Sequence, residues 1–103
     1  MTKTVYEVYE LYTETRKRSD TLTASEAQDA LASAFMDDEK PDCVFDSASA
    51  ASEFIAAQGT GRIDDFGTYW RVYGWIAYEV DLTIENNETI DRSSIGYSAV
   101  SAF

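Results

Sequence analysis

The first segment with a clear pattern is residues 4–13, Thr-Val-Tyr-Glu-Val-Tyr-Glu-Leu-Tyr-Thr. Its β-branched and aromatic residues are typical of a strand. Alternation places apolar side chains on both faces: Val5, Tyr9 and Leu11 on one, and Tyr6, Val8 and Tyr12 on the other. We therefore expect this strand to be covered, at least in part, on both sides.

A longer strand pattern covers residues 68–84. One parity of this segment is apolar and includes Trp70, Val72, Ile76, Tyr78, Val80, Leu82 and Ile84. Gly74 lies in the same series, so the segment is either one long strand that bends at Gly74 or a hairpin that turns there. Residues 85–88 (Glu-Asn-Asn-Glu) predict a turn because Asn tolerates left-handed geometry, and residues 89–97 predict the returning strand.

A helix is predicted between these two strand regions, over about residues 24–38. It begins with Thr23-Ala24-Ser25-Glu26, which matches a capping box, and continues with apolar residues at helical spacing. We expect it to stop before Pro41, which disfavours a helical conformation at the preceding residue. Three acids, Asp37, Asp38 and Glu39, would then lie at its C-terminal end, where the helix dipole makes them unfavourable.

The remaining segments complete a single α+β domain. Residues 43–45 predict a brief buried strand, and residues 47–57 predict a second helix capped by Asp46 or Ser47. Three glycines and two adjacent acids indicate a loop over 58–67. We expect residues 1–103 to form one domain in which two helices pack on a mainly antiparallel sheet, in the order β-α-β-α-β-β.

Composition excludes several kinds of chemistry. The 103 residues include no His, which removes imidazole catalysis and the usual zinc sites, and one Cys, which excludes an intrachain disulfide. Cys43 lies in an apolar run, so we interpret it as a small core residue. The segment Gly59-Thr60-Gly61 lacks the Gly-Lys-Ser/Thr of a phosphate-binding loop. We therefore expect no cofactor, no metal site and no catalytic nucleophile.

The carboxylates gather in two groups: Asp37, Asp38, Glu39, Asp42 and Asp46 in the first, and Asp64 with Asp65 in the second. The first group lacks the spacing and the central glycine of an EF-hand. A domain of this size seldom encloses the cleft that a glycosidase needs between its two carboxyl groups. We interpret the first group as a solvated acidic turn.

The distribution of charged residues gives the strongest indication of function. With 8 Lys and Arg against 19 Asp and Glu, the formal charge is −11, so direct binding to nucleic acid or to an anionic membrane is not expected. The excess is uneven, because residues 1–18 have a net charge of +1 and residues 19–61 a net charge of −8. Residues 16–18 (Arg-Lys-Arg) form the only positive cluster. Acids spaced along the first helix can imitate the phosphates of nucleic acid.

These features resemble the small, acidic, cofactor-free proteins of phages and mobile elements, among them the DNA-mimicking anti-CRISPR and anti-restriction inhibitors. The resemblance is carried by the acids of residues 20–53, by the pair at 64–65 and by the small α+β layout. It implies a non-enzymatic inhibitor that binds a basic nucleic-acid-binding protein or a nuclease complex. The partner-binding candidates are Glu26, Asp29, Asp37, Asp38, Glu39, Asp42, Asp64, Asp65, Tyr73 and Trp75.

The alternative is an acidic interaction or dimerisation module that uses an aromatic sheet face, because exposed Tyr and Trp dominate many protein interfaces. Tyr73 and Trp75 enter the candidate set for this reason, and we expect a monomer or a homodimer. A small carboxylate enzyme would need a deep pocket around two of the acids. The N-terminus has no apolar targeting segment, no stretch could span a membrane, and an unpaired Cys43 suits a reducing compartment, so we expect a cytoplasmic protein.

Overall fold

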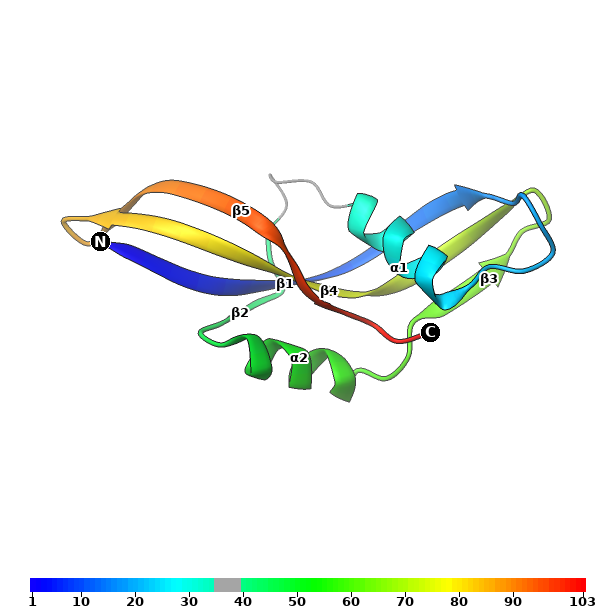
Figure 1. The fold of residues 1–103 in the computed structure, drawn as a ribbon, viewed down its shortest axis with the longest axis horizontal. Coiled ribbons are helices and arrows are strands. Elements are labelled where there is room, and N and C mark those ends of the chain that lie inside the picture. The colour runs from blue at the N-terminus through cyan, green and yellow to red at the C-terminus, as the bar shows by residue number, and fades with distance from the viewer. Residues whose placement is uncertain (35–39) are drawn as a thin grey trace.

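The computed structural model describes residues 1–34 and 40–103. Its elements, shown in Figure 1, are β1 (Thr2–Arg16), α1 (Ala24–Ser33), β2 (Cys43–Phe45), α2 (Ala48–Ala57), β3 (Arg62–Asp65), β4 (Tyr69–Glu85) and β5 (Glu88–Val100). All strand pairs are antiparallel, and the predicted α+β class is confirmed. The molecule is elongated, with extents of 53 × 24 × 17 Å.

Strand β4 is the centre of a curled sheet. Along one edge it pairs with β1 over nearly its whole length, from Tyr69 opposite Arg16 to Thr83 opposite Thr2. Its other edge is shared by two strands, since β3 pairs near the start of β4 and β5 pairs with the remainder. The short strand β2 extends the sheet beyond β1.

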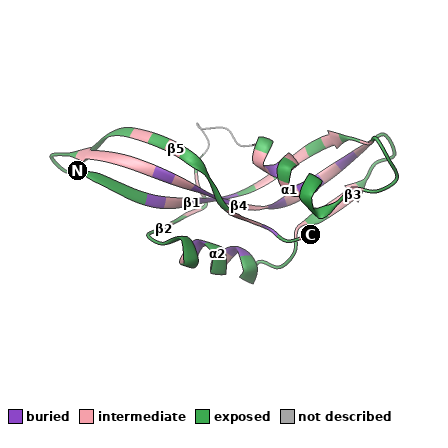
Figure 2. Cartoon of the chain, in the orientation of Figure 1, coloured by how far each residue is buried: buried purple, intermediate pink, exposed green. Residues whose placement is uncertain are grey.

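The two helices cover opposite faces of this sheet (Figure 1). Leu31 of α1 packs against Val72, whereas Ile55 of α2 packs near Val8 and Ala77. Val72 and Ala77 have opposite parity in β4, so their side chains point to opposite sides. The expectation that β1 is covered on both sides is therefore confirmed. Figure 2 shows that buried residues gather along the middle of the sheet and that the β4–β5 turn is exposed.

Gly74 lies inside one continuous strand, paired with Leu11, and makes no hairpin. A Cβ atom at this position would lie 2.7 Å from Leu31 Cδ1 and 3.1 Å from Ser101 Oγ. The missing side chain lets α1 and the C-terminal segment approach the middle of β4. The hairpin instead turns at Asn86 and Asn87, whose φ values of 54° and 63° confirm the predicted left-handed turn.

Several predictions are wrong in detail. The predicted buried strand at 43–45 is only partly buried, since Val44 is 50% exposed, and the returning strand extends to Val100 and not to residue 97. The first helix ends at Ser33 and not at residue 38, and Ala34 is its C-cap. The Tyr78 hydroxyl donates to the Ala32 carbonyl at 2.9 Å, so the sheet itself satisfies a carbonyl of the last turn. The predicted loop over 58–67 contains a further strand, β3, which adds one strand to the predicted order. Acids are depleted in strands, and β3 depends on its pairing with β4 rather than on its composition.

Candidate functional site

Of the predicted partner-binding acids, Asp37, Asp38 and Glu39 lie outside the described residues. Glu26 completes the predicted capping box of α1: its carboxylate accepts from the Thr23 backbone N–H at 3.1 Å and from the Thr23 hydroxyl at 2.9 Å. These hydrogen bonds lower the pKa of Glu26. The Asp42 carboxylate accepts from the Glu10 backbone N–H at 2.7 Å, which ties the start of β2 to β1. Both acids therefore have a local structural role.

Asp64 and Asp65 are largely neutralised by neighbouring cations. The Lys17 ammonium donates to Asp65 at 2.8 Å, and the Gly67 N–H donates to its other oxygen. Together these hydrogen bonds lower the pKa of Asp65, the Lys17 contact contributing most. The Arg62 guanidinium lies 3.2 Å from Asp64. The second acidic pair of the sequence is therefore part of an ion-paired surface.

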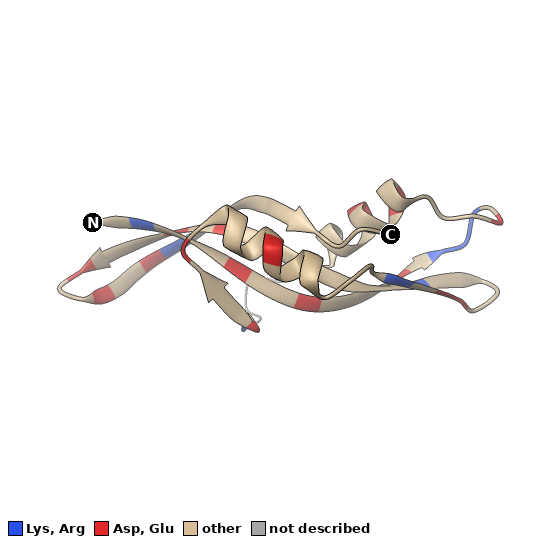
Figure 3. Cartoon of the chain, turned by 90° about the horizontal axis from the view of Figure 1, so that it is seen from below, with Lys and Arg blue, Asp and Glu red and all other residues tan. Residues whose placement is uncertain are grey.

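Most of the described acids that have no ion pair lie outside the set of predicted site residues. Within the described residues, Asp29 on α1 has no ion pair, and neither do four acids near the β4–β5 turn, here called the hairpin acids: Asp81, Glu85, Glu88 and Asp91. Glu85 and Glu88 are directly opposite each other in the strand register. Figure 3 shows this acidic turn at one end of the molecule and most of the Lys and Arg at the other.

The hairpin acids were not among the predicted site residues. In the sequence they are spread over eleven positions between apolar strand residues, so they form no visible cluster. The alternation of acids with Leu82 and Ile84 was the available signal, because a two-residue turn brings the polar positions of both strands together. Of the sixteen described Asp and Glu residues, five take part in ion pairs and eleven do not.

The aromatic candidates on β4 are partly covered. Trp75 packs edge-on against Phe54 of α2, with ring centres 5.3 Å apart. Tyr73 lies beneath the Arg62 guanidinium, at 4.1 Å, and beside Tyr12 at 5.9 Å. Two other aromatic residues are more exposed, Tyr12 (62%) and Phe66 (47%), and neither was among the predicted site residues.

A buried polar contact joins β1 to β5 across β4. Glu7 is only 8% exposed; its carboxylate accepts from the Tyr9 hydroxyl at 2.6 Å and forms an ion pair with Arg92. Burial raises the pKa of Glu7, but the hydrogen bonds from Arg92 and Tyr9 outweigh it, and the net pKa is lowered. Burial and the neighbouring Glu7 raise the pKa of Tyr9. The contact holds two strands that do not pair directly.

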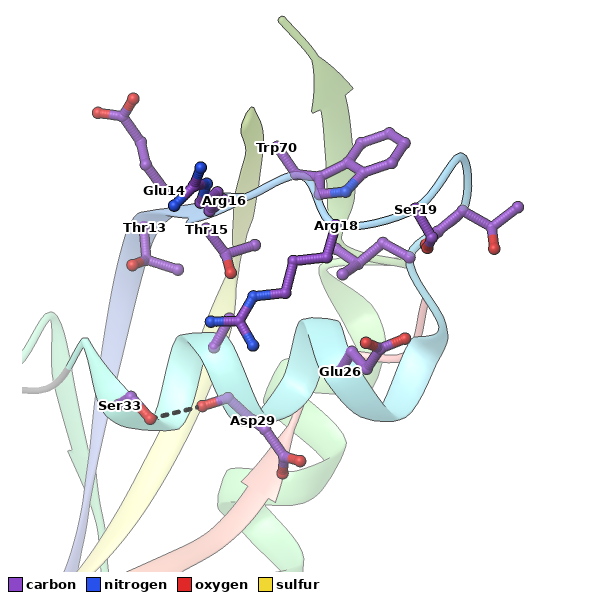
Figure 4. A pocket seen from close by; sticks show the side chains of 13 residues that line it. Thr13, Glu14, Thr15, Arg16, Arg18, Ser19, Glu26, Asp29, Ser33 and Trp70 are labelled. Carbon is purple, nitrogen blue, oxygen red and sulfur yellow. Dashed lines mark hydrogen bonds between the residues drawn. The ribbon is translucent and has the colours of Figure 1, made fainter. Parts of the chain in front are cut away.

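A cavity of about 410 Å³ lies between α1, the end of β1 and the turn that follows it (Figure 4). Its walls include Arg18, Trp70 and several hydroxyl side chains. Three acids also line it: Glu14, Glu26 and Asp29. Glu26 is engaged in the helix cap, and the Asp29 side chain points away from Arg18 in Figure 4.

Other kinds of site find little support in the described part of the chain. It contains no group of three or more His, Cys, Asp or Glu that could hold a metal ion. Cys43 is half-buried, and burial together with the adjacent Asp42 raises the pKa of its thiol, which disfavours the reactive thiolate. No helix among the described residues is long and apolar enough to cross a membrane. Comparison of the chain with models of protein families, with curated proteins and with solved structures finds no match.

Proposed function

We propose that this protein is a non-enzymatic binding protein whose acidic surface occupies the nucleic-acid site of a basic partner, in the manner of a DNA-mimic inhibitor. The observation that carries the proposal is the set of eleven described carboxylates without an ion pair, on a body 53 Å long. Since one strand of a duplex advances about 3.4 Å per nucleotide, such a body spans about 16 nucleotides.

The mechanism is electrostatic competition. Acids without cations produce a negative field that steers a basic surface toward the molecule and repels nucleic acid from the complex. The hairpin acids and Asp29 belong to the eleven described carboxylates that have no Lys or Arg of the described chain within 4.0 Å, and the hairpin acids are gathered at one turn. Asp37, Asp38, Glu39 and Asp42 remain candidates of the same kind.

The arrangement at the turn also supports a role in binding. Like charges directly opposite each other in a sheet are destabilising, and Glu85 and Glu88 are placed in this way. A chain selected for stability alone would favour other residues at these positions, whereas function often retains unfavourable local choices. An acidic surface that serves only solubility does not require this pairing.

The proposal is tested in two stages. Partners are first captured from the source cells at about 50 and about 200 mM NaCl, because contacts of this kind weaken steeply over that range. The captured protein is then purified, and displacement of its nucleic acid by wild-type protein is followed by fluorescence anisotropy. We expect a basic nucleic-acid-binding protein that is retained at low salt and displaced from its nucleic acid by the wild type.

Three quadruple variants, each with the same change of net charge, show which acidic surface binds the partner. The first replaces the hairpin acids (D81N, E85Q, E88Q, D91N) and the second the predicted turn (D37N, D38N, E39Q, D42N). The control replaces ion-paired acids (E14Q, D46N, D64N, D65N). We expect at least about tenfold weaker binding for the first variant or the second, and a smaller loss for the control. Equal losses in all three, or affinity that does not change with salt, would contradict the proposal.

A second candidate function is favoured by the exposed rings at the other end of the molecule. Tyr12 and Phe66 share a region with Arg71, whose guanidinium lies 5.8 Å and 4.8 Å from the two ring centres. Aromatic residues and Arg are enriched at protein interfaces. A homodimer that dissociates on Tyr12→Ala or Phe66→Ala, with little response to salt, would favour this interaction module over the acidic inhibitor.

A further inference from the structure

Two residues of the positive cluster at 16–18, Lys17 and Arg18, have different surroundings in the structure. Lys17 is held in place, since its ammonium donates to Asp65 at 2.8 Å and lies 4.6 Å from the centre of the Trp70 ring. Arg18 has neither a hydrogen bond nor an ion pair with any part of the chain that the structure describes. Figure 4 shows its guanidinium extended from the turn toward α1, over the cavity.

The cavity beneath Arg18 has the dimensions of a small-molecule site. Its volume of about 410 Å³ lies within the range of about 300–1,000 Å³ that is typical of such sites. Thr13 and Thr15 line one wall from β1, Leu22 and Ala30 contribute apolar surface, and Trp70 lines the cavity from β4. The lining therefore combines charged side chains, among them Arg18, with hydroxyls and an apolar area, and such a mixture can orient a polar ligand.

The charges around the cavity leave an anion as the complementary ligand. Three acids belong to the lining, but each carboxylate is directed elsewhere. Glu14 pairs with Arg71 at 3.7 Å, Glu26 is engaged by Thr23, and the Asp29 side chain points away from Arg18 in Figure 4. Arg16 and Arg18 are thus the two cations of the lining, and neither side chain has a hydrogen bond or an ion pair among the described residues. Of the two, Arg18 extends toward α1 over the cavity (Figure 4), and the planar fork of its guanidinium fits a carboxylate or a phosphate with two hydrogen bonds.

We propose that this cavity binds a small organic anion, with a carboxylate or phosphate group on Arg18, a hydrogen bond to Thr13 or Thr15, and an apolar group against Trp70 and Leu22. The two anionic groups share the same chemistry at Arg18. The proposal does not depend on the acidic-surface function, because the hairpin acids lie at the opposite end of the molecule.

Benzoate and phenyl phosphate are the probes, since each joins one of the two anionic groups to an apolar ring. Each is titrated into the ¹⁵N-labelled full chain and followed by NMR. We expect saturable shifts of the Trp70 indole and of Thr13 and Thr15, with a dissociation constant below about 1 mM for at least one probe. The tighter probe identifies the carboxylate or the phosphate as the preferred group.

Arg18→Gln removes the proposed contact without touching the core, because Arg18 is exposed. We expect it to weaken binding at least about tenfold, the loss of a charge-assisted bidentate contact. Arg62→Gln is the matched control: it makes the same change of charge outside the cavity and should bind as the wild type does. The proposal is overturned if neither probe gives saturable shifts, if the shifts map away from the cavity, or if the two variants bind equally.

Discussion

The two ends of the elongated sheet differ in whether their acidic side chains form ion pairs. At one end, here called the cationic end, lie Arg16, Lys17, Arg18, Arg62 and Arg71, and three of these pair with acids while stacking on aromatic rings. At the other end the hairpin acids have no such partners among the described residues. An acid count along the sequence does not distinguish these two situations.

The difference shows that pairing, and not composition, decides which acids are available to a partner. The Asp65 carboxylate accepts hydrogen bonds from Lys17 and Gly67, which stabilise its negative charge and lower its pKa. Glu88 instead lies opposite Glu85, so its nearest strand partner does not stabilise its negative charge. A basic partner would gain more by approaching the hairpin than by competing with Lys17.

The largest expected effect comes from the contact that joins the strands between the two ends. Glu7→Gln leaves Arg92 without its carboxylate in a mostly buried position, and we expect a loss of about 3 kcal/mol in the free energy of unfolding. Urea denaturation measures this loss. Glu10→Gln, an exposed change three positions along β1, should cost less than about 0.5 kcal/mol. Equal effects of the two variants would show that the Glu7 contact is not structural.

The pH dependence of stability tests whether the ion-paired acids Glu7 and Asp65 stabilise the fold. Folding lowers the pKa of Glu7 below its ordinary 4.5 and that of Asp65 below 3.8, so the folded state binds fewer protons than the unfolded state in this range. Stability should be constant well above pH 4.5 and should fall as the pH drops through the lowered values. Thermal unfolding between pH 7 and pH 3 tests this, and Glu7→Gln should make the dependence shallower.

The turn itself gives a smaller effect. Asn87 has a φ of 63°, a conformation that costs most residues with a Cβ atom about 1 kcal/mol. Asn87→Ala should therefore lower the free energy of unfolding by about 1 kcal/mol, whereas Asn87→Gly should cost less because glycine has no such penalty. Urea denaturation of both variants measures the difference. A turn that tolerates Ala as well as Gly would not depend on this geometry.

The smallest expected effect is a gain. Glu88→Thr removes one of two opposed acids and introduces a good strand residue, so we expect stability to rise by about 0.5 kcal/mol. The gain should shrink at high salt, because salt screens exposed charges. Asp64→Asn at the cationic end should give no gain, since Asp64 already lies 3.2 Å from Arg62. A gain in stability from both substitutions would show that ion pairing does not distinguish the acids at the two ends.

Local signals in the sequence were sufficient for several features of the fold. The capping box from Thr23 to Glu26 and the left-handed turn at Asn86 and Asn87 depend on neighbouring residues, and both appear as predicted. The alternation in β1 and β4 likewise indicated their buried faces, because side-chain direction in a strand follows from position alone.

Features that depend on pairing between strands or on ion pairs across the fold could not be predicted. The strand β3 pairs locally with the start of β4, but two of its four residues are acids, which are depleted in strands and hide the strand pattern. The ion pair between Lys17 and Asp65 joins residues 48 positions apart, and that between Glu7 and Arg92 joins residues 85 apart. These contacts determine which charges are neutralised, so they also determine which candidate residues remain open to a partner.

The pairing of β1 with β4 has a consequence for how the chain folds during its synthesis. Every residue of β1 pairs with a residue of β4, and the nearest of these pairs, Arg16 with Tyr69, still spans 53 positions. At a synthesis rate of about 5–20 residues per second, the first strand waits about 3–10 seconds for its partner to leave the ribosome. Such non-local pairing also slows folding itself to the millisecond-to-second range. Strand β1, apolar on both faces, is thus the segment of this protein most in need of protection by a chaperone while the chain is being made.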